Sequence, residues 1–330
     1  MSGVLDHHLA PLSPFLDDPA VREVVVNRPG EIGVETAEGW RWVEDGRLTS
    51  PWLMTLARAA AAVTGQDVGS EAPICSTSLP RGARCQIVLP PAAGEVTLCI
   101  RRPMGEAPDL HVMAREGLFD IAADAALFMG PEQKLAALKA SGDWASFLAL
   151  AVRLRKTILV SGATGSGKTT LARALAAKIP DGERLVTIED ARELELAHRN
   201  LVRLTWAREG QGRASLGPGD LLACALRLRP DRILLGEVRD GASAFHLLRN
   251  IASGHPGSIA TIHAGSCALA LDQLALLVRE TPAGRDLPSD EVRALLSGLI
   301  DILVQMDRVD GRFRVVEVRH GGALKPALAA

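Results

Sequence analysis

The stretch Gly162-Ala163-Thr164-Gly165-Ser166-Gly167-Lys168-Thr169 decides the fold class of this chain. It has the spacing Gly-x-x-x-x-Gly-Lys-Thr of a phosphate loop. Glycines are needed there because the backbone must turn tightly around phosphate oxygens and point its amides at them. The lysine of such a loop reaches the β- and γ-phosphates, and the threonine hydroxyl binds Mg²⁺. The pattern predicts that residues 162–170, through Thr170, bind ATP, with Thr169 as a ligand of Mg²⁺.

The residues around this loop alternate between strand and helix patterns. Such alternation is typical of an α/β fold with a mainly parallel sheet and helices on both faces. A glycine-rich turn that binds no nucleotide is the alternative, but an apolar strand before the loop and an amphipathic helix after it favour phosphate binding. Strands are predicted at 157–161, 184–189, 232–235 and 258–262, helices at 168–178, 220–228, 242–252 and 268–278, and a final hairpin at 301–319.

Ionisable residues follow three of these strands. Glu237 follows one apolar strand, Glu189 and Asp190 end another, and His263 follows a third. Because the carboxyl ends of parallel strands meet at one edge of a sheet, we expect these residues to lie beside the phosphates. We predict that Glu237 and Glu189 hold Mg²⁺, partly through water, that one of them orients the attacking water, and that His263 senses phosphate. Solvated strand ends and a structural histidine are the plain alternatives.

The residues before the loop divide into two parts. Short apolar alternation at 21–42, a helical pattern at 51–63 and strand patterns at 84–89 and 95–101 indicate a small α+β unit. Scattered proline, glycine and aspartate follow. We therefore predict an N-terminal α+β domain at 1–105, a linker at 106–131, and the phosphate-loop domain at 132–330, beginning with a helical stretch at 132–155.

Composition excludes several classes of protein. Of the 330 residues 47% are hydrophobic and 23% charged, the net charge is −2, and tyrosine is absent. These values argue against disorder and against sequence-specific nucleic-acid binding, which calls for basic surfaces or stacking aromatics. The apolar runs are too short to span a bilayer, no basic residue precedes Arg22, and no Cys-x-x-Cys pair occurs. We expect a cytoplasmic chain with reduced, buried cysteines.

Four motifs in this order resemble the secretion ATPase superfamily: the phosphate loop, 187–190, 229–240 and 254–265. That family names them Walker A, Asp box, Walker B and His box. Within it, the chain is most similar to the hexameric traffic ATPase of type IV secretion and conjugation systems. Further matching stretches lie at 79–91, 100–103, 183–190 and 284–288.

The resemblance implies a RecA-like P-loop motor domain preceded by a small α+β N-terminal domain. It implies a homo-hexamer that hydrolyses ATP to power or gate type IV secretion or conjugative transfer. Other cytoplasmic and inner-membrane components would be its partners, with only peripheral membrane contact. In that family ATP sits between the two domains, and N-terminal arginines help to hold its phosphates. The matching positions are Arg101 and Arg102, with Arg84 as a third; the family often has lysine second, so which arginine reaches phosphate stays open.

Two alternatives remain at this point. Motors for pilus assembly or tight adherence share the sequence motif at Gly236–Asp240. The Cys-x-x-Cys zinc module found in pilus-assembly relatives is missing from this chain. A nucleotide-gated scaffold with negligible turnover is the second alternative. The set Lys168, Glu189 and Glu237 argues against it, because a scaffold needs no group to orient water.

Overall fold

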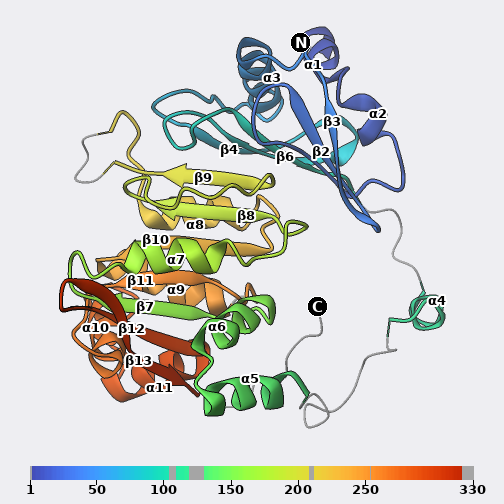
Figure 1. Cartoon of the computed structure of the whole chain (residues 1–330). Helices are drawn as coiled ribbons and strands as arrows, with labels where there is room; N and C mark the ends of the chain where they lie inside the picture. The colour runs from blue at the N-terminus through green and yellow to red at the C-terminus, as the bar shows by residue number, and fades with distance from the viewer. Residues whose placement is uncertain (1, 104–108, 119–129, 208–211, 253, 322–330) are drawn as a thin grey trace.

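The structure is a computed structural model of the chain, and it describes residues 2–103, 109–118, 130–207, 212–252 and 254–321 (Figure 1). Within these ranges the chain forms a six-stranded and a seven-stranded sheet, called here the N-terminal and the C-terminal sheet. No helix in these ranges is both long enough and apolar enough to span a bilayer. All five cysteines are free and buried, as expected.

The N-terminal sheet is antiparallel, in the order β3-β2-β1-β6-β5-β4. Alternate residues of β1 face opposite sides. Val24 and Val26 pack in a core with apolar residues of α1 and α3, while Val25 packs in a core with the helices of the C-terminal sheet. The elements are α1 Ser2–Leu9, α2 Ser13–Leu16, β1 Glu23–Val26, β2 Glu31–Thr36, β3 Gly39–Glu44, α3 Ser50–Ala62, β4 Ile74–Ser78, β5 Arg84–Val88 and β6 Thr97–Arg101.

The C-terminal sheet has the order β13-β12-β7-β11-β10-β8-β9 and is parallel except for the β12–β13 hairpin. Every strand and helix expected from the alternating pattern is present. The strands are β7 Ile158–Gly162, β8 Leu185–Glu189, β9 Leu201–Thr205, β10 Arg232–Val238, β11 Ile259–Ile262, β12 Ile302–Val309 and β13 Arg312–His320.

Helices cover both faces of this sheet. Alternate residues of β7 again divide between two cores: Ile158 and Val160 pack with α6 and α7, and Leu159 packs in the core that contains α8, α9, α10 and α11. This confirms an α/β, RecA-like sheet preceded by an α+β layer. The helices are α5 Gly130–Ser141, α6 Trp144–Arg153, α7 Lys168–Ala176, α8 Pro218–Ala225, α9 Gly241–Ala252, α10 Cys267–Glu280 and α11 Ser289–Leu299.

The helical stretch expected at 132–155 is confirmed, with one break inside it. It is split into α5 and α6 at Gly142, whose φ of 72° ends α5. Asp143 then begins α6 by accepting a hydrogen bond from the backbone of Ser146 at 3.1 Å. A short helix, α4 Leu110–Arg115, lies in the expected linker. Much of 106–131 lies outside the described residues, and the two boundaries between the predicted segments stay a prediction.

The two sheets meet along the edge strand β9 (Figure 1). The backbone N–H of Thr205 donates to the oxygen of Ala92 at 2.9 Å, and Ala93 forms a bridge with Leu204. Behind this contact lies Arg184, which is fully buried and donates to Asn27 of the N-terminal layer at 2.8 Å. The N-terminal layer thus covers one side edge of the C-terminal sheet, four strands from β7.

Candidate nucleotide-binding site

The phosphate loop runs from the end of β7 to the start of α7. Three of its glycines have positive φ: 156° at Gly162, 74° at Gly165 and 91° at Gly167. At Gly162 a β-carbon would meet the backbone oxygen of Met306 at 2.5 Å, so only glycine fits between β7 and β12. The loop therefore makes the tight backbone turn that the sequence predicted, at the N-terminus of a helix.

Lys168 folds back over this loop. Its Nζ donates to the oxygens of Gly162 and Ala163, both at 3.0 Å, and lies 3.3 Å from Nδ1 of His263. Burial lowers the pKa of Lys168, and the nearby carboxylate of Glu237 opposes that shift. The ammonium is thus held at the centre of the loop, where phosphate oxygens would replace two carbonyl partners.

Glu237, at the end of β10, is the centre of a charged cluster. Nε2 of His263 lies 2.5 Å from its Oε1, and Arg239 pairs with its other oxygen. Arg239 also pairs with Asp190 at 3.2 Å. The structure therefore brings together the ends of β8, β10 and β11, as the sequence predicted. Arg239 was not among the predicted residues, although its position two residues after Glu237 on an extended segment is a usable signal.

Glu189 is held differently. Its side chain is buried, and its Oε1 accepts backbone N–H groups from Glu193 at 3.0 Å and Leu194 at 2.8 Å. Its Oε2 is buried and has no hydrogen-bond partner among the described residues. One oxygen therefore fixes the turn after β8, and the other remains as an acceptor, directed neither to backbone nor to solvent.

These oxygens fit Mg²⁺, a hard cation that prefers carboxylate, hydroxyl and water ligands. The hydroxyl of Thr169 donates to Oε2 of Glu193 at 3.0 Å, so Thr169 and Glu189 are linked through one residue. Glu193 was not predicted from the sequence, because nothing marks it before the turn after β8 is known. Among the described residues there is no cluster of three or more acidic, histidine or cysteine side chains that would hold a metal by itself. Such a site would need water and phosphate to complete it.

The predicted N-terminal arginines are not brought to the phosphate loop of their own chain. Arg101 pairs with Glu23 at 3.2 Å and lines a cavity of about 500 Å³ with Arg84, Arg227 and Arg229, called here the arginine cavity. Arg229 precedes the first residue of β10, so this cavity lies at the amino edge of the sheet, opposite the phosphate loop.

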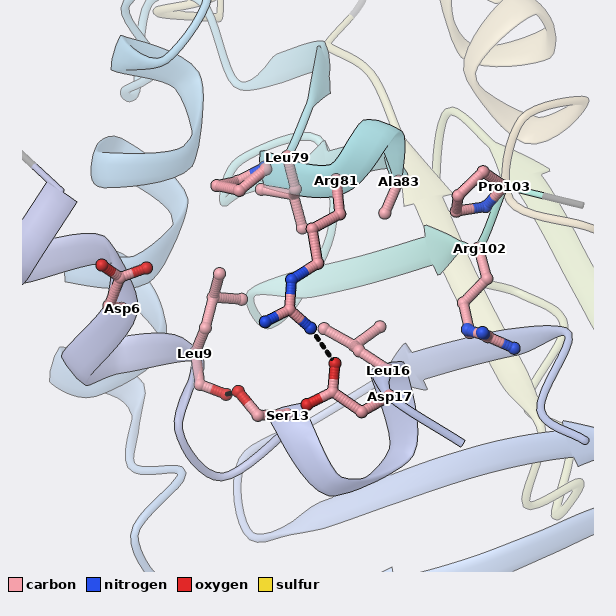
Figure 2. Close-up of a pocket in the computed structure, with 11 residues that line it drawn as sticks. Asp6, Leu9, Ser13, Leu16, Asp17, Leu79, Arg81, Ala83, Arg102 and Pro103 are labelled. Carbon is pink, nitrogen blue, oxygen red and sulfur yellow. Dashed lines mark hydrogen bonds and ion pairs between the residues drawn. The ribbon is translucent and has the colours of Figure 1, made fainter. Parts of the chain in front are cut away.

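Arg102 lines neither the phosphate loop nor the arginine cavity. It donates to the backbone oxygen of Val21 at 2.8 Å and lines a separate cavity of about 320 Å³ next to α1 and α2 (Figure 2). Arg81 and Asp17 form an ion pair in the same cavity. The contact of Arg101 or Arg102 with ATP therefore stays a prediction.

A phosphate loop with carboxylates and a histidine at one edge of a RecA-like sheet is the arrangement typical of ATPases. The comparisons agree with this class. The family model described as Type II/IV secretion system protein matches residues 6–305. The chain belongs to that family.

The relatives are similar over nearly their whole length. VirB11, a type IV secretion system protein of Bartonella quintana, is 44% identical over 94% of this chain and 91% of its own. PtlH, a type IV secretion system protein of Bordetella pertussis, is 42% identical over 97% and 96%. The crystal structure of the VirB11 ATPase from the Brucella suis type IV secretion system, in complex with sulphate, has a TM-score of 0.89 and 40% identity, covering 96% and 94%. These matches confirm the resemblance and support a type IV secretion ATPase over the pilus-assembly alternative.

Proposed function

We propose that this chain binds ATP with Mg²⁺ at residues 162–170 and hydrolyses it as one subunit of a homo-hexameric ring. The ring powers or gates type IV secretion or conjugative transfer. The observation that carries the proposal is the convergence of Lys168, Glu237 and His263, joined by distances of 3.3 and 2.5 Å at the phosphate-loop edge. A scaffold that only binds nucleotide has no need of a carboxylate placed there.

Binding rests on the loop and on three oxygen-bearing side chains. The amides of the loop hold the phosphates, and Lys168 moves its ammonium from two backbone oxygens to the β- and γ-phosphates. Thr169, Glu189 and Glu237 hold Mg²⁺, partly through water. When bound, the ion neutralises charge on the phosphates during transfer.

Glu237 is the better candidate for orienting the attacking water. Within the described part of the chain its carboxylate is held by the side chains of Arg239 and His263, which can exchange partners when ATP arrives. Glu189 is fixed through one oxygen by two backbone amides. His263 lies between Lys168 and Glu237, so loss of the γ-phosphate would change the contacts of both. This gives the site two states, which the elements around it can follow.

The positions of the N-terminal arginines support the proposed ring. Arg84 and Arg101 face the amino edge of their own C-terminal sheet, so within one chain they cannot complete the phosphate site. In a ring with a heterologous interface, the arginine cavity can receive phosphates bound to a neighbouring subunit. Arg102, in the separate cavity next to α1 and α2, is the alternative contact. Partners are other cytoplasmic and inner-membrane components of a secretion apparatus, with peripheral membrane contact and no sequence-specific nucleic-acid binding.

Phosphate release and light scattering of the purified full chain test this proposal together. We expect Mg²⁺-dependent ATP turnover, its near-complete loss in Lys168→Ala, and normal turnover in the control Lys178→Ala, which removes an exposed lysine beyond the end of α7. With an ATP analogue and Mg²⁺ the mass should approach six times the 35.0 kDa of one chain. A ring without turnover would favour the scaffold. A chain that stays monomeric at micromolar concentration refutes the ring.

A further inference from the structure

The β12–β13 hairpin extends beyond the phosphate loop. β12 pairs with β7 in parallel from Ile302 opposite Ile158 to Met306 opposite Gly162, where β7 ends. The residues that follow Met306 in β12, and those that pair with them in β13, therefore project past the first residue of the loop (Figure 1). This hairpin tip is exposed throughout 307–316. It forms a wall beside the loop that belongs to neither domain core.

Phe313 on this hairpin lies directly against the loop. A β-carbon added to Gly167 would meet three atoms of its ring, Cγ at 3.0 Å, Cδ1 at 3.2 Å and Cδ2 at 3.3 Å. Three ring atoms at nearly equal distance mean that the ring covers the backbone of Gly167 rather than touching it with an edge. Gly167 is also the residue directly before Lys168, so the aromatic ring borders the part of the loop that binds phosphate.

The exposure of Phe313 is the second observation. Its side chain is 55% exposed, although burying a phenylalanine side chain would stabilise the chain by roughly 1.5–3 kcal/mol. Phenylalanine is scarce here, with six in 330 residues and no tyrosine. Arg308, which pairs with Phe313 across the hairpin and therefore lies on the same face, is also exposed. An exposed aromatic ring beside an arginine offers a surface for stacking a flat, electron-rich ring next to negative charge.

The base of a nucleotide held by the loop is a flat, electron-rich ring of this kind. The β- and γ-phosphates of that nucleotide would accept hydrogen bonds from the backbone amides around Gly167 and Lys168. The α-phosphate, ribose and base must then leave the loop along one of its sides. One side is the hairpin wall. Base–aromatic stacking requires only an accessible ring within reach of the nucleoside and tolerates variation in the base.

We propose that Phe313 is the platform on which the base of the bound nucleotide stacks, which makes the β12–β13 hairpin part of the nucleotide site. The inference rests on the proposed binding of ATP at residues 162–170. It assigns the base to the C-terminal hairpin of the same chain, whereas the triphosphate is held by the loop and the other residues already proposed for it. A ligand with the phosphates but no base therefore separates the two assignments.

Calorimetric titration of the full chain with ATP and with inorganic tripolyphosphate, both with Mg²⁺, tests the platform. We expect Phe313→Ala to raise the Kd for ATP about tenfold, the order of loss that removing one base–aromatic stack causes. The Kd for tripolyphosphate should change less than twofold. Val316→Ala, on the same strand and 51% exposed, is the matched control and should bind both ligands as the wild type does. Phe313→Trp should restore ATP binding, and its added fluorescence should be quenched by ATP and not by tripolyphosphate.

Three results overturn the proposal. An ATP Kd within twofold of wild type in Phe313→Ala shows that the ring does not stack the base. Equal weakening of ATP and tripolyphosphate shows that Phe313 only supports the backbone of Gly167. Wild-type protein that binds neither ligand refutes the nucleotide site itself, so failure of the platform and failure of the proposed function give different results.

Discussion

Replacement of the two glutamates, one at a time, gives the sharpest test of the catalytic assignment. Glu237→Gln keeps the size of the side chain and removes its charge. The substitution would weaken two charged contacts of this side chain, the close pairing with Arg239 and the 2.5 Å contact with His263. No backbone group of the described residues donates to the Glu237 carboxylate, so the strand end should keep its shape.

The expected magnitude follows from the chemistry of the site. A positioned group that takes part in proton transfer or orients the attacking water contributes typically 10²–10⁴-fold to the rate, so kcat should fall by that order. The Kd for ATP should rise no more than about threefold, because removing a negative charge beside the phosphates relieves repulsion. A fall in kcat without a rise in Kd identifies an interaction that matters after binding.

Glu189→Gln is the comparison. The amide oxygen can still accept both backbone N–H groups, those of Glu193 and Leu194, so the turn after β8 should persist. We expect a higher Mg²⁺ concentration to be needed for the half-maximal rate, and a smaller loss of kcat than in Glu237→Gln. Single-turnover phosphate release with a separate binding titration measures both quantities. If Glu189→Gln lowers kcat more than Glu237→Gln does, or if Glu237→Gln weakens ATP binding in proportion to its rate, the roles assigned here are reversed.

Three further predictions concern stability and the buried polar groups. Arg184→Met removes three buried hydrogen bonds, of which the one to Asn27 joins the two sheets, and should lower the free energy of unfolding by about 3 kcal/mol in urea titration. Arg173→Met, which removes an exposed ion pair, should change the free energy of unfolding by less than about 1 kcal/mol. Equal effects would contradict the importance of the buried arginine. Burial raises the pKa of Cys99 and Cys224 to about 12, so a thiol reagent at pH 8 should label neither in native protein and both in guanidinium, and rapid native labelling of either would refute their burial. Burial also raises the pKa of Glu23, so the folded state holds its proton more tightly than the unfolded state; stability should therefore fall as pH rises from about 4.3, the ordinary glutamate value, through the raised value, and Glu23→Gln should flatten that slope. An unchanged slope in Glu23→Gln would count against this.

The phosphate loop and the parallel sheet could be predicted from sequence because their signals are local. Each strand and helix near the loop has its own periodicity, and the loop needs its glycines whatever surrounds it. The family resemblance then added the order of motifs. The predicted edge of the sheet, with Glu189, Glu237 and His263 beside Lys168, follows from one rule, that parallel strands end together.

The parts that were missed depend on contacts between distant segments. β4, Ile74–Ser78, consists mainly of small polar residues and becomes a strand because it pairs with β5. β9 is a strand because it lies between β8 and the segment around Ala92. The place of Arg101 could not be derived either, since it depends on which edge of the sheet the N-terminal layer covers. Phe313 gave no local signal, because an exposed phenylalanine in a hairpin has no periodic pattern.

The covering of β9 has a consequence for dissecting this protein. β9 is the last strand of the parallel sheet, and its outer hydrogen-bonding groups near Leu204 and Thr205 are met by Ala92 and Ala93. A fragment that begins after the N-terminal layer would leave this edge open, with the apolar side chains of Val202 and Leu204 losing their cover. Open edges of this kind recruit strands from other molecules. The N-terminal layer therefore also protects the chain against aggregation, and damage to the turn at residues 89–94 should first become visible as insoluble protein.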